Sequence, residues 1–278
     1  MPYRAWAAVA LLVLVAALPA QQLREHLPGW NVSFAVPTGW RVLQNSGRAA
    51  ALADSLDSSA IFVAAGFLAT AADAADELRA MFEDLHYVAT PVREPADTTI
   101  AGRRALIAHY RGAGRAGPVE TRAAVVFTTH GTGVTVLGLA SGDRSDAVAE
   151  IVVRVAASLD AAAPHTNEAW IAGLAGHWQY VPPASAAKDS SAAGRAVIDE
   201  WLEFDGRERF TWRSRTIVSV HVPGTGPLTA EASSDSGTYS VVGSTLVLRG
   251  QARRRALDIH LAGERLSLGG RVFQRKPA

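Results

Sequence analysis

The chain has 278 residues, with 27 Lys and Arg against 26 Asp and Glu, so its formal net charge is +1. This near-neutral charge gives no reason to expect binding to nucleic acid or to an anionic membrane surface. The absence of cysteine excludes disulfides, thiol nucleophiles and thiolate metal sites, and the 49% of hydrophobic residues exclude global disorder.

The first twenty residues have the order of a secretory signal peptide. Arg4 precedes an apolar run over residues 5–18, and Pro19 and Ala20 then precede a polar pair. About fourteen apolar residues fall short of the roughly twenty that a membrane-spanning helix needs. We therefore expect cleavage near Ala20, no stable membrane anchor afterwards, and a periplasmic or secreted location. The scarcity of lysine beside abundant alanine and arginine indicates a GC-rich bacterial source.

An α+β domain is predicted over residues 28–160. Thr70 can cap a helix that runs to residue 85, because the apolar residues of this segment recur at helical spacing. A second helix with the same spacing opens at Ser145 or Asp146 and runs to residue 159. Strands are predicted over residues 33–36, 40–43, 60–67, 104–110, 119–129 and 134–140. Short Gly-rich turns between the later strands predict antiparallel pairing.

A second, all-β domain is predicted over residues 170–278, after a linker of small residues and proline at 161–169. Tight turns at Asp205-Gly206 and at Gly243 separate alternating segments, which is a hairpin signal. The predicted strands are residues 198–204, 208–212, 217–222, 238–241, 245–248, 256–261, 265–268 and 271–274. About eight short strands favour a small barrel or sandwich. The predicted fold class is therefore α+β, with an antiparallel sheet and packed helices followed by a small barrel.

The N-terminal half, over residues 28–160, resembles the PsbP-like fold. The resemblance rests on Phe-Ala-Val-Pro-Thr-Gly-Trp at 34–40, the helix at 75–85, Ile-Ala-Gly-Arg at 100–103 and the terminal helix. Relatives of this fold include an extrinsic photosystem subunit, a Ran-binding nuclear import factor and bacterial envelope or secretion-chaperone proteins. The resemblance implies binding of protein partners more often than catalysis.

The C-terminal half resembles a lipocalin-like small barrel. In that family a Gly-x-Trp motif opens the first strand and a late arginine packs on the tryptophan. Gly176, Trp178 and either Arg271 or Arg275 match this pattern. The contact would combine cation–π attraction with apolar burial, so it implies a device that closes the barrel.

Two motifs suggest chemistry that their surroundings do not support. Residues 112–117 match G-x-G-x-x-G, but Pro118 and a second strand follow instead of a helix, so we interpret the segment as a hairpin loop. Ser185 and Lys188 match the S-x-x-K of serine acyl-transferases, but they lie in an Ala/Ser-rich loop without the companion motifs. The eight histidines show no metal-ligand spacing. We expect no catalytic residues, no metal and no cofactor.

Three hypotheses follow, and the first is an exported, non-catalytic protein that binds a protein partner in the cell envelope. The second is binding of a small apolar ligand inside the barrel. Its lining would be Phe210 and Trp212, with Trp178 and Tyr239 nearby. A barrel filled by its own side chains would exclude this ligand. The third and weakest is a serine hydrolase that uses Ser185 and Lys188.

Overall fold

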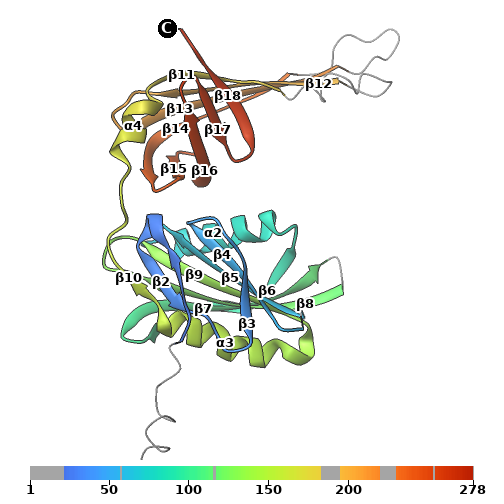
Figure 1. Ribbon diagram of the computed structural model, residues 1–278. Coiled ribbons are helices and arrows are strands. Elements are labelled where there is room, and N and C mark those ends of the chain that lie inside the picture. Colours follow the sequence, from blue (N-terminus) through green and yellow to red (C-terminus); the bar gives the residue numbers. More distant parts are fainter. Residues whose placement is uncertain are drawn as a thin grey trace, which may run out of the picture.

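The computed structural model describes residues 22–56, 58–114, 117–182, 195–219, 230–252 and 254–277. Figure 1 shows two parts, an N-terminal layered α+β part and a C-terminal barrel, joined by one connection. The predicted fold class is confirmed. The predicted signal peptide over residues 1–20 lies outside the described residues. Among the residues that are described, no helix is long and apolar enough to cross a bilayer.

The N-terminal part is built on a seven-stranded sheet in which every pairing is antiparallel. The strand order is β3-β4-β5-β9-β8-β7-β6. A separate three-stranded sheet has the order β1-β2-β10. The strands are β1 (Arg24–Leu27), β2 (Val32–Ala35), β3 (Trp40–Asn45), β4 (Ala49–Asp54), β5 (Ser59–Gly66), β6 (Val88–Ile100), β7 (Arg103–Gly114), β8 (Gly117–Phe127), β9 (Gly133–Ala140) and β10 (Asp160–Ala161).

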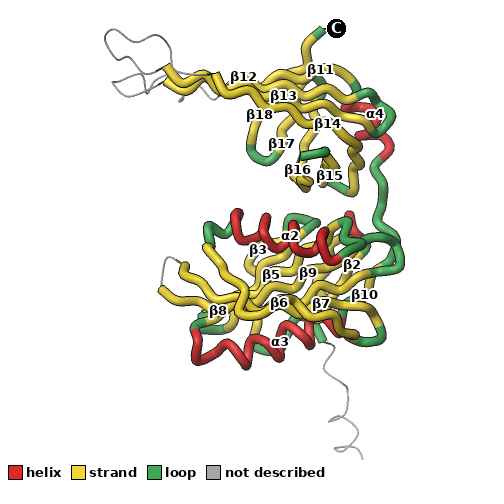
Figure 2. Tube along the Cα trace, turned by 180° about the vertical axis from the view of Figure 1, so that it is seen from behind, coloured by secondary structure: helices red, strands yellow, loops and turns green. Residues whose placement is uncertain are grey.

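Two helices cover opposite faces of this sheet (Figure 2). Helix α2 (Ala71–Asp84) has the predicted cap at Thr70, with a full capping box to Asp73. Helix α3 (Ser145–Ser158) begins where it was predicted, after the short helix η3 (Gly142–Arg144). Each helix buries its apolar face in its own cluster of sheet residues.

The barrel is closed by eight antiparallel strands in chain order, so it leaves no open sheet edge. A short helix, α4 (Glu168–Leu174), precedes its first strand and packs on its core. The turn at Asp205-Gly206 is confirmed, because the Asp205 carboxylate accepts hydrogen bonds from the amides of Arg207 and Arg209. The strands are β11 (Gly176–Tyr180), β12 (Arg195–Phe204), β13 (Arg209–Ser219), β14 (Ala230–Val242), β15 (Thr245–Gly250), β16 (Arg254–Ala262), β17 (Arg265–Leu268) and β18 (Arg271–Lys276).

Several elements differ from the predictions. Strands β1, β4, β6 and β10 and helix α4 were not predicted, and residues 208–212 and the start of 217–222 belong to one strand, β13. The predicted hairpin at residues 112–117 is confirmed, since β7 and β8 pair antiparallel up to Gly114 and Gly117. The predicted domain limits at 28–160, 161–169 and 170–278 stay predictions. Within the predicted linker, the structure places Ala161 at the end of β10 and Asn167 as the cap of α4.

The two parts touch along a junction formed by the connection and two turns. The amide of His165 donates to the carbonyl of Gly29 at 3.2 Å, and the amide of Gly243 donates to the carbonyl of His165 at 3.2 Å. Gly29, in the helical turn η2 (Pro28–Trp30), and Gly243, between β14 and β15, lie so close that a Cβ on Gly243 would be 2.7 Å from the Gly29 Cα. Val242, Val247 and Ala256 of the barrel accordingly join the hydrophobic cluster of the N-terminal part.

Candidate functional site

The four residues predicted to bind a ligand inside the barrel belong to one buried cluster. The exposed fractions of Trp178, Phe210, Trp212 and Tyr239 are 0%, 3%, 9% and 2%. Two of them bond to helix α4: the Trp178 indole donates to the carbonyl of Leu174 at 2.7 Å, and the Tyr239 hydroxyl donates to that of Ile171 at 3.3 Å. In this packing the four side chains form the barrel core. Their role in ligand binding stays a prediction.

The predicted contact between an arginine and Trp178 is made by Arg275. Its guanidinium carbon lies 4.4 Å from the centroid of the indole ring. The same guanidinium donates to the carbonyls of Ala175 and Gly173, both at 2.6 Å, and so ties the last strand to the end of helix α4. The alternative, Arg271, instead pairs with the buried carboxylate of Glu200 at 2.6 Å. Both arginines therefore stabilise the barrel, at different places.

The residues of the hydrolase hypothesis, Ser185 and Lys188, lie outside the described residues. A different serine, Ser145, meets a glutamate and a histidine at the start of helix α3. The Ser145 hydroxyl donates to Glu120 Oε2 at 2.9 Å, and His109 Nε2 lies 2.9 Å from the same oxygen. The carboxylate thus stands between the hydroxyl and the imidazole, whereas a serine nucleophile needs the imidazole as its direct neighbour.

The charge state of Glu120 also disfavours acid–base catalysis by this cluster. Hydrogen bonds from Arg111 first, and then from His109 and Ser145, lower the pKa of Glu120 from 4.5 to about 2. A carboxylate with so low a pKa is a poor proton acceptor at neutral pH. We interpret the cluster as a structural link between the sheet and helix α3.

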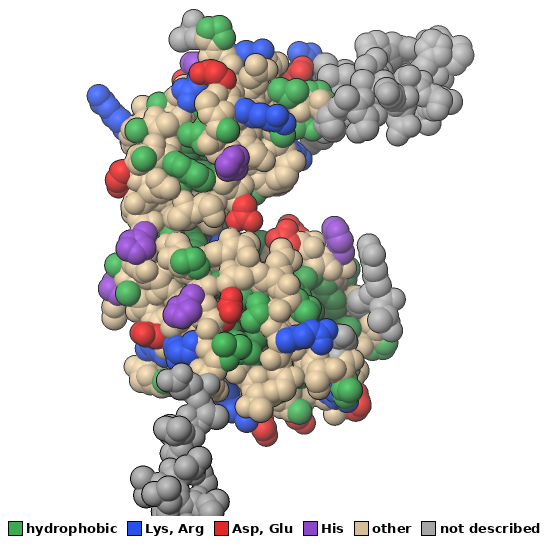
Figure 3. Space-filling view, in the orientation of Figure 1, with side chains coloured by type: hydrophobic (Ala, Val, Ile, Leu, Met, Phe, Trp, Pro, Cys, Tyr) green, Lys and Arg blue, Asp and Glu red, His purple; other side chains and the backbone are tan. Residues whose placement is uncertain are grey.

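A groove of about 590 Å³ lies between helix α2 and barrel strands β15, β16 and β18, and we call it the α2 groove. Its apolar lining comes from both parts of the molecule. Figure 3 shows the molecule hollowed between the two parts, with acidic side chains at the margin. The apolar side chains that line it are Trp30, Phe67, Ala80, Met81, Val247, Ala256 and Leu257.

The two walls of the α2 groove carry opposite charges. Helix α2 contributes five carboxylates, and the barrel contributes three arginines. One pair bridges the groove, because Arg254 bonds to the carboxylate of Asp73. Burial raises the pKa of Asp73, but hydrogen bonds from two backbone amides and the charge of Arg254 outweigh it, so the net pKa is lowered. The charged residues of the lining are Arg48, Asp73, Asp76, Glu77, Glu83, Asp84, Arg254, Arg255 and Arg271.

The far end of helix α2 is acidic. Glu83 and Asp84 are exposed, and within the described parts of the chain neither forms an ion pair. The last turn of the helix contains no basic residue. Because the carbonyl end of a helix carries partial negative charge, this end of the groove favours a cationic group.

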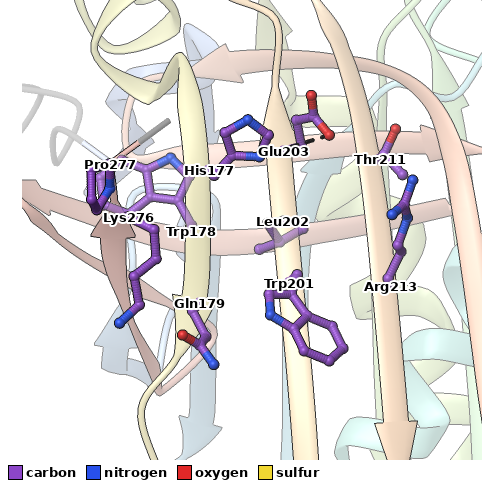
Figure 4. Close-up of a pocket in the computed structure, with 10 residues that line it drawn as sticks. All are labelled: His177, Trp178, Gln179, Trp201, Leu202, Glu203, Thr211, Arg213, Lys276 and Pro277. Atoms are coloured by element: carbon purple, nitrogen blue, oxygen red, sulfur yellow. Dashed lines mark ion pairs between the residues drawn. The ribbon is translucent and has the colours of Figure 1, made fainter.

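A second concave surface lies on the outside of the barrel and has a volume of about 620 Å³ (Figure 4). The strand register arranges the outward side chains in and beside it in two rows across β18, β11, β12 and β13, of which all but Gln274 line the concavity. The first row is Gln274, Gln179, Trp201 and Arg213, and the second is Lys276, His177, Glu203 and Thr211. We call these eight residues the Trp201 face. Sequence reasoning missed it because it considered only inward-pointing aromatic residues.

No family model matches the sequence, and no curated protein matches it. Among solved structures, the chain is similar to cyanobacterial PsbP from Synechocystis sp. PCC 6803, with 15% identity over 52% of this chain and 96% of that one, at a TM-score of 0.39. It is also similar to a Bacteroides thetaiotaomicron protein, with 12% identity over 60% of this chain and 56% of that one, at a TM-score of 0.38. A third is Mycobacterium tuberculosis LpqN, involved in cell envelope biogenesis, with 13% identity over 51% of this chain and 86% of that one, at a TM-score of 0.35.

PsbP, the first of these, is also the fold that residues 28–160 resemble in sequence. The fold itself is defined by the topology in Figure 1: an antiparallel sheet covered by helices, followed by a closed eight-stranded barrel. This barrel is consistent with the lipocalin-like resemblance of the C-terminal half, including the contact between Arg275 and Trp178.

Proposed function

We propose that this chain is an exported, non-catalytic protein that binds a protein partner in the cell envelope, and that the partner docks in the α2 groove. The observation that carries the proposal is the composition of the groove. It combines an apolar lining with an acidic wall whose end, at Glu83 and Asp84, forms no ion pair among the described residues. Protein interfaces combine an apolar centre with a polar rim in the same way.

The chemistry of the groove defines the partner. Apolar side chains such as Phe67, Met81 and Leu257 favour an apolar residue of the partner. The carboxylates of Glu83 and Asp84 favour a lysine or arginine beside it, because complementary charge steers association and fixes register. The partner segment we expect is therefore an apolar residue flanked by basic ones. The location in the envelope rests on the apolar segment over residues 5–18.

Photo-crosslinking tests this proposal in envelope extracts of the native organism. A crosslinking amino acid replaces Ala80, which lines the groove, or Val153, which is 42% exposed on helix α3. We expect one adduct of defined mass from position 80 and none from position 153. The double variant Glu83→Gln/Asp84→Gln should reduce the yield of this adduct at least fivefold. A yield that these two changes leave unaltered, or no adduct at position 80, would refute the groove as the docking site.

A further inference from the structure

The Trp201 face has a chemistry that protein docking does not explain. Among the described residues, Trp201 is the one aromatic side chain of the exposed large hydrophobic group, at 38% exposure. Alternation along β12 accounts for this position, since Leu202 and Phe204 point inward and are at most 2% exposed. A single exposed hydrophobic side chain is common on protein surfaces. What distinguishes this one is its set of neighbours.

Every other member of the Trp201 face can form hydrogen bonds. In the first row, Gln179 and Arg213 are the cross-strand neighbours of Trp201, and Figure 4 shows the Arg213 guanidinium extending towards Thr211. In the second row, His177 Nδ1 lies 3.8 Å from Glu203 Oε2. The surface thus offers one aromatic plate surrounded by donors and acceptors, with Pro277 as a further apolar group beside Lys276.

Two cations of this face, Arg213 and Lys276, are without an ion-pair partner among the described residues. Both line the concavity. They lie on β13 and β18, three inter-strand spacings apart, which corresponds to about 15 Å across the sheet. One ligand that reaches both must therefore be longer than a single ring, and it must carry at least two negative groups.

These features fit a sugar chain better than other ligands. A pyranose ring has an apolar face of C–H groups, which can stack on an indole, and a rim of hydroxyl groups, which can bond to amides, carboxylates and imidazoles. A nucleic acid would require a broader basic surface, but the carboxylate of Glu203 lies in the middle of this one. Arg213 and Lys276, which have no ion-pair partner in the described part of the chain, favour an acidic sugar.

We propose that the Trp201 face binds an acidic oligosaccharide, with one sugar ring stacked on Trp201 and acidic groups held by Arg213 and Lys276. The site uses barrel strands alone, so it is independent of the proposed docking of a protein in the α2 groove. The acidic group of the sugar can be a carboxylate or a sulfate, since both accept hydrogen bonds from a guanidinium.

Calorimetric titration of the full-length mature protein tests the proposal. The probes are tetragalacturonate, a sulfated chondroitin tetrasaccharide and, as the neutral control, maltotetraose. We expect at least one acidic probe to bind tenfold or more tightly than maltotetraose, and this affinity should fall as salt rises. The two acidic probes distinguish a carboxylate ligand from a sulfate ligand. Failure of both acidic probes to bind, or equal binding of maltotetraose, would overturn the proposal.

Variants then localise the binding. Trp201→Ala should weaken it at least tenfold and Trp201→Phe much less, because a phenyl ring retains the stacking surface. Arg213→Gln should weaken it about threefold to tenfold and reduce its salt dependence. Arg93→Gln, at an exposed position on β6, is the matched control and should change nothing. Circular dichroism checks that each variant is folded. Unchanged affinity in a folded Trp201→Ala variant would contradict the assignment of this face.

Discussion

Replacement of Arg275 tests how the barrel is closed. Its guanidinium stacks on Trp178 at 4.4 Å and donates to two carbonyls of the α4 segment, and its side chain is only 28% exposed. A hydrogen bond from a charged group contributes about 1.5–3 kcal/mol and a cation–π contact about 0.5–2 kcal/mol. Water can replace part of each contact, so we expect Arg275→Ala to lower the free energy of unfolding by about 3 kcal/mol. Arg275→Lys keeps the charge but loses the planar guanidinium, so we expect it to lower the free energy of unfolding by about 1–2 kcal/mol.

Urea unfolding followed by circular dichroism measures these changes, and hydrogen exchange read by mass spectrometry localises them. Exchange in Arg275→Ala should accelerate in α4, β11 and β18, and should remain unchanged in β5 and β9 of the other part. Arg265→Ala, at an exposed position on the neighbouring strand β17, is the control and should stay within about 0.5 kcal/mol of the wild type. If Arg275→Ala changed the free energy of unfolding as little as this control does, the Arg275 guanidinium would not stabilise the closure of the barrel, and the prediction would be wrong.

Three further predictions concern the N-terminal part. A Cβ on Gly138 would lie 2.5 Å from Val148 Cγ1. Gly138→Ala should therefore force helix α3 off the sheet and lower the free energy of unfolding, measured in urea, by about 1–3 kcal/mol. An unchanged midpoint of urea unfolding would contradict this close packing. Thr135 is fully buried, and its hydroxyl has no hydrogen-bond partner among the described residues. Thr135→Val should therefore raise the free energy of unfolding by about 1 kcal/mol in the same assay. A lower free energy of unfolding in this variant would mean that the hydroxyl forms a hydrogen bond. Because the pKa of Glu120 is lowered to about 2, its contribution to stability is complete above about pH 4.5 and is lost as the pH falls towards 2. Thermal unfolding across this range should show a weaker acid dependence in Glu120→Gln, and an identical dependence would exclude this carboxylate as its source.

The sequence predicted the helices well because their signals are local. Thr70 precedes a run of apolar residues at helical spacing, and the structure shows both the cap and the buried face of α2. Strand β6 gave no comparable signal. Nearly all of its residues are exposed, and Pro91 and Pro95 interrupt any alternation. Its place at the edge of the sheet explains both properties, since an edge strand needs neither a buried face nor every amide.

Strand β4 and the long strand β13 were harder to predict for different reasons. Strand β4 is built mostly from alanines, which are weak strand formers although Ala50 and Ala53 are buried. In β13 the polar run Arg213-Ser214-Arg215 divides the apolar pattern in two, so the segment was predicted as separate strands. The ladder with β12 nevertheless continues through it without a break, because backbone hydrogen bonds hold the pairing whatever the side chains are.

The two candidate sites differ in how much of them the sequence contains. Period-two alternation that points Leu202 and Phe204 inward necessarily points Trp201 outward, so the centre of the Trp201 face was predictable from one strand. Its neighbours were not, because they come from four strands whose register only the closed barrel defines. The α2 groove was beyond prediction altogether, since it exists only where helix α2 meets strands about 170 residues later in the chain.

The two proposed binding sites depend on different parts of the fold. Close approach of Gly29 and Gly243 fixes the barrel against the N-terminal part on one side. The pair between Arg254 and Asp73 holds the first turn of α2, and Asp84, which forms no ion pair with any described residue, lies at the opposite end of the same helix. The groove therefore depends on both parts of the chain, whereas the Trp201 face depends on barrel strands alone. Among the described residues that line the two surfaces, none is shared, so one molecule could hold a sugar chain and a protein partner at the same time.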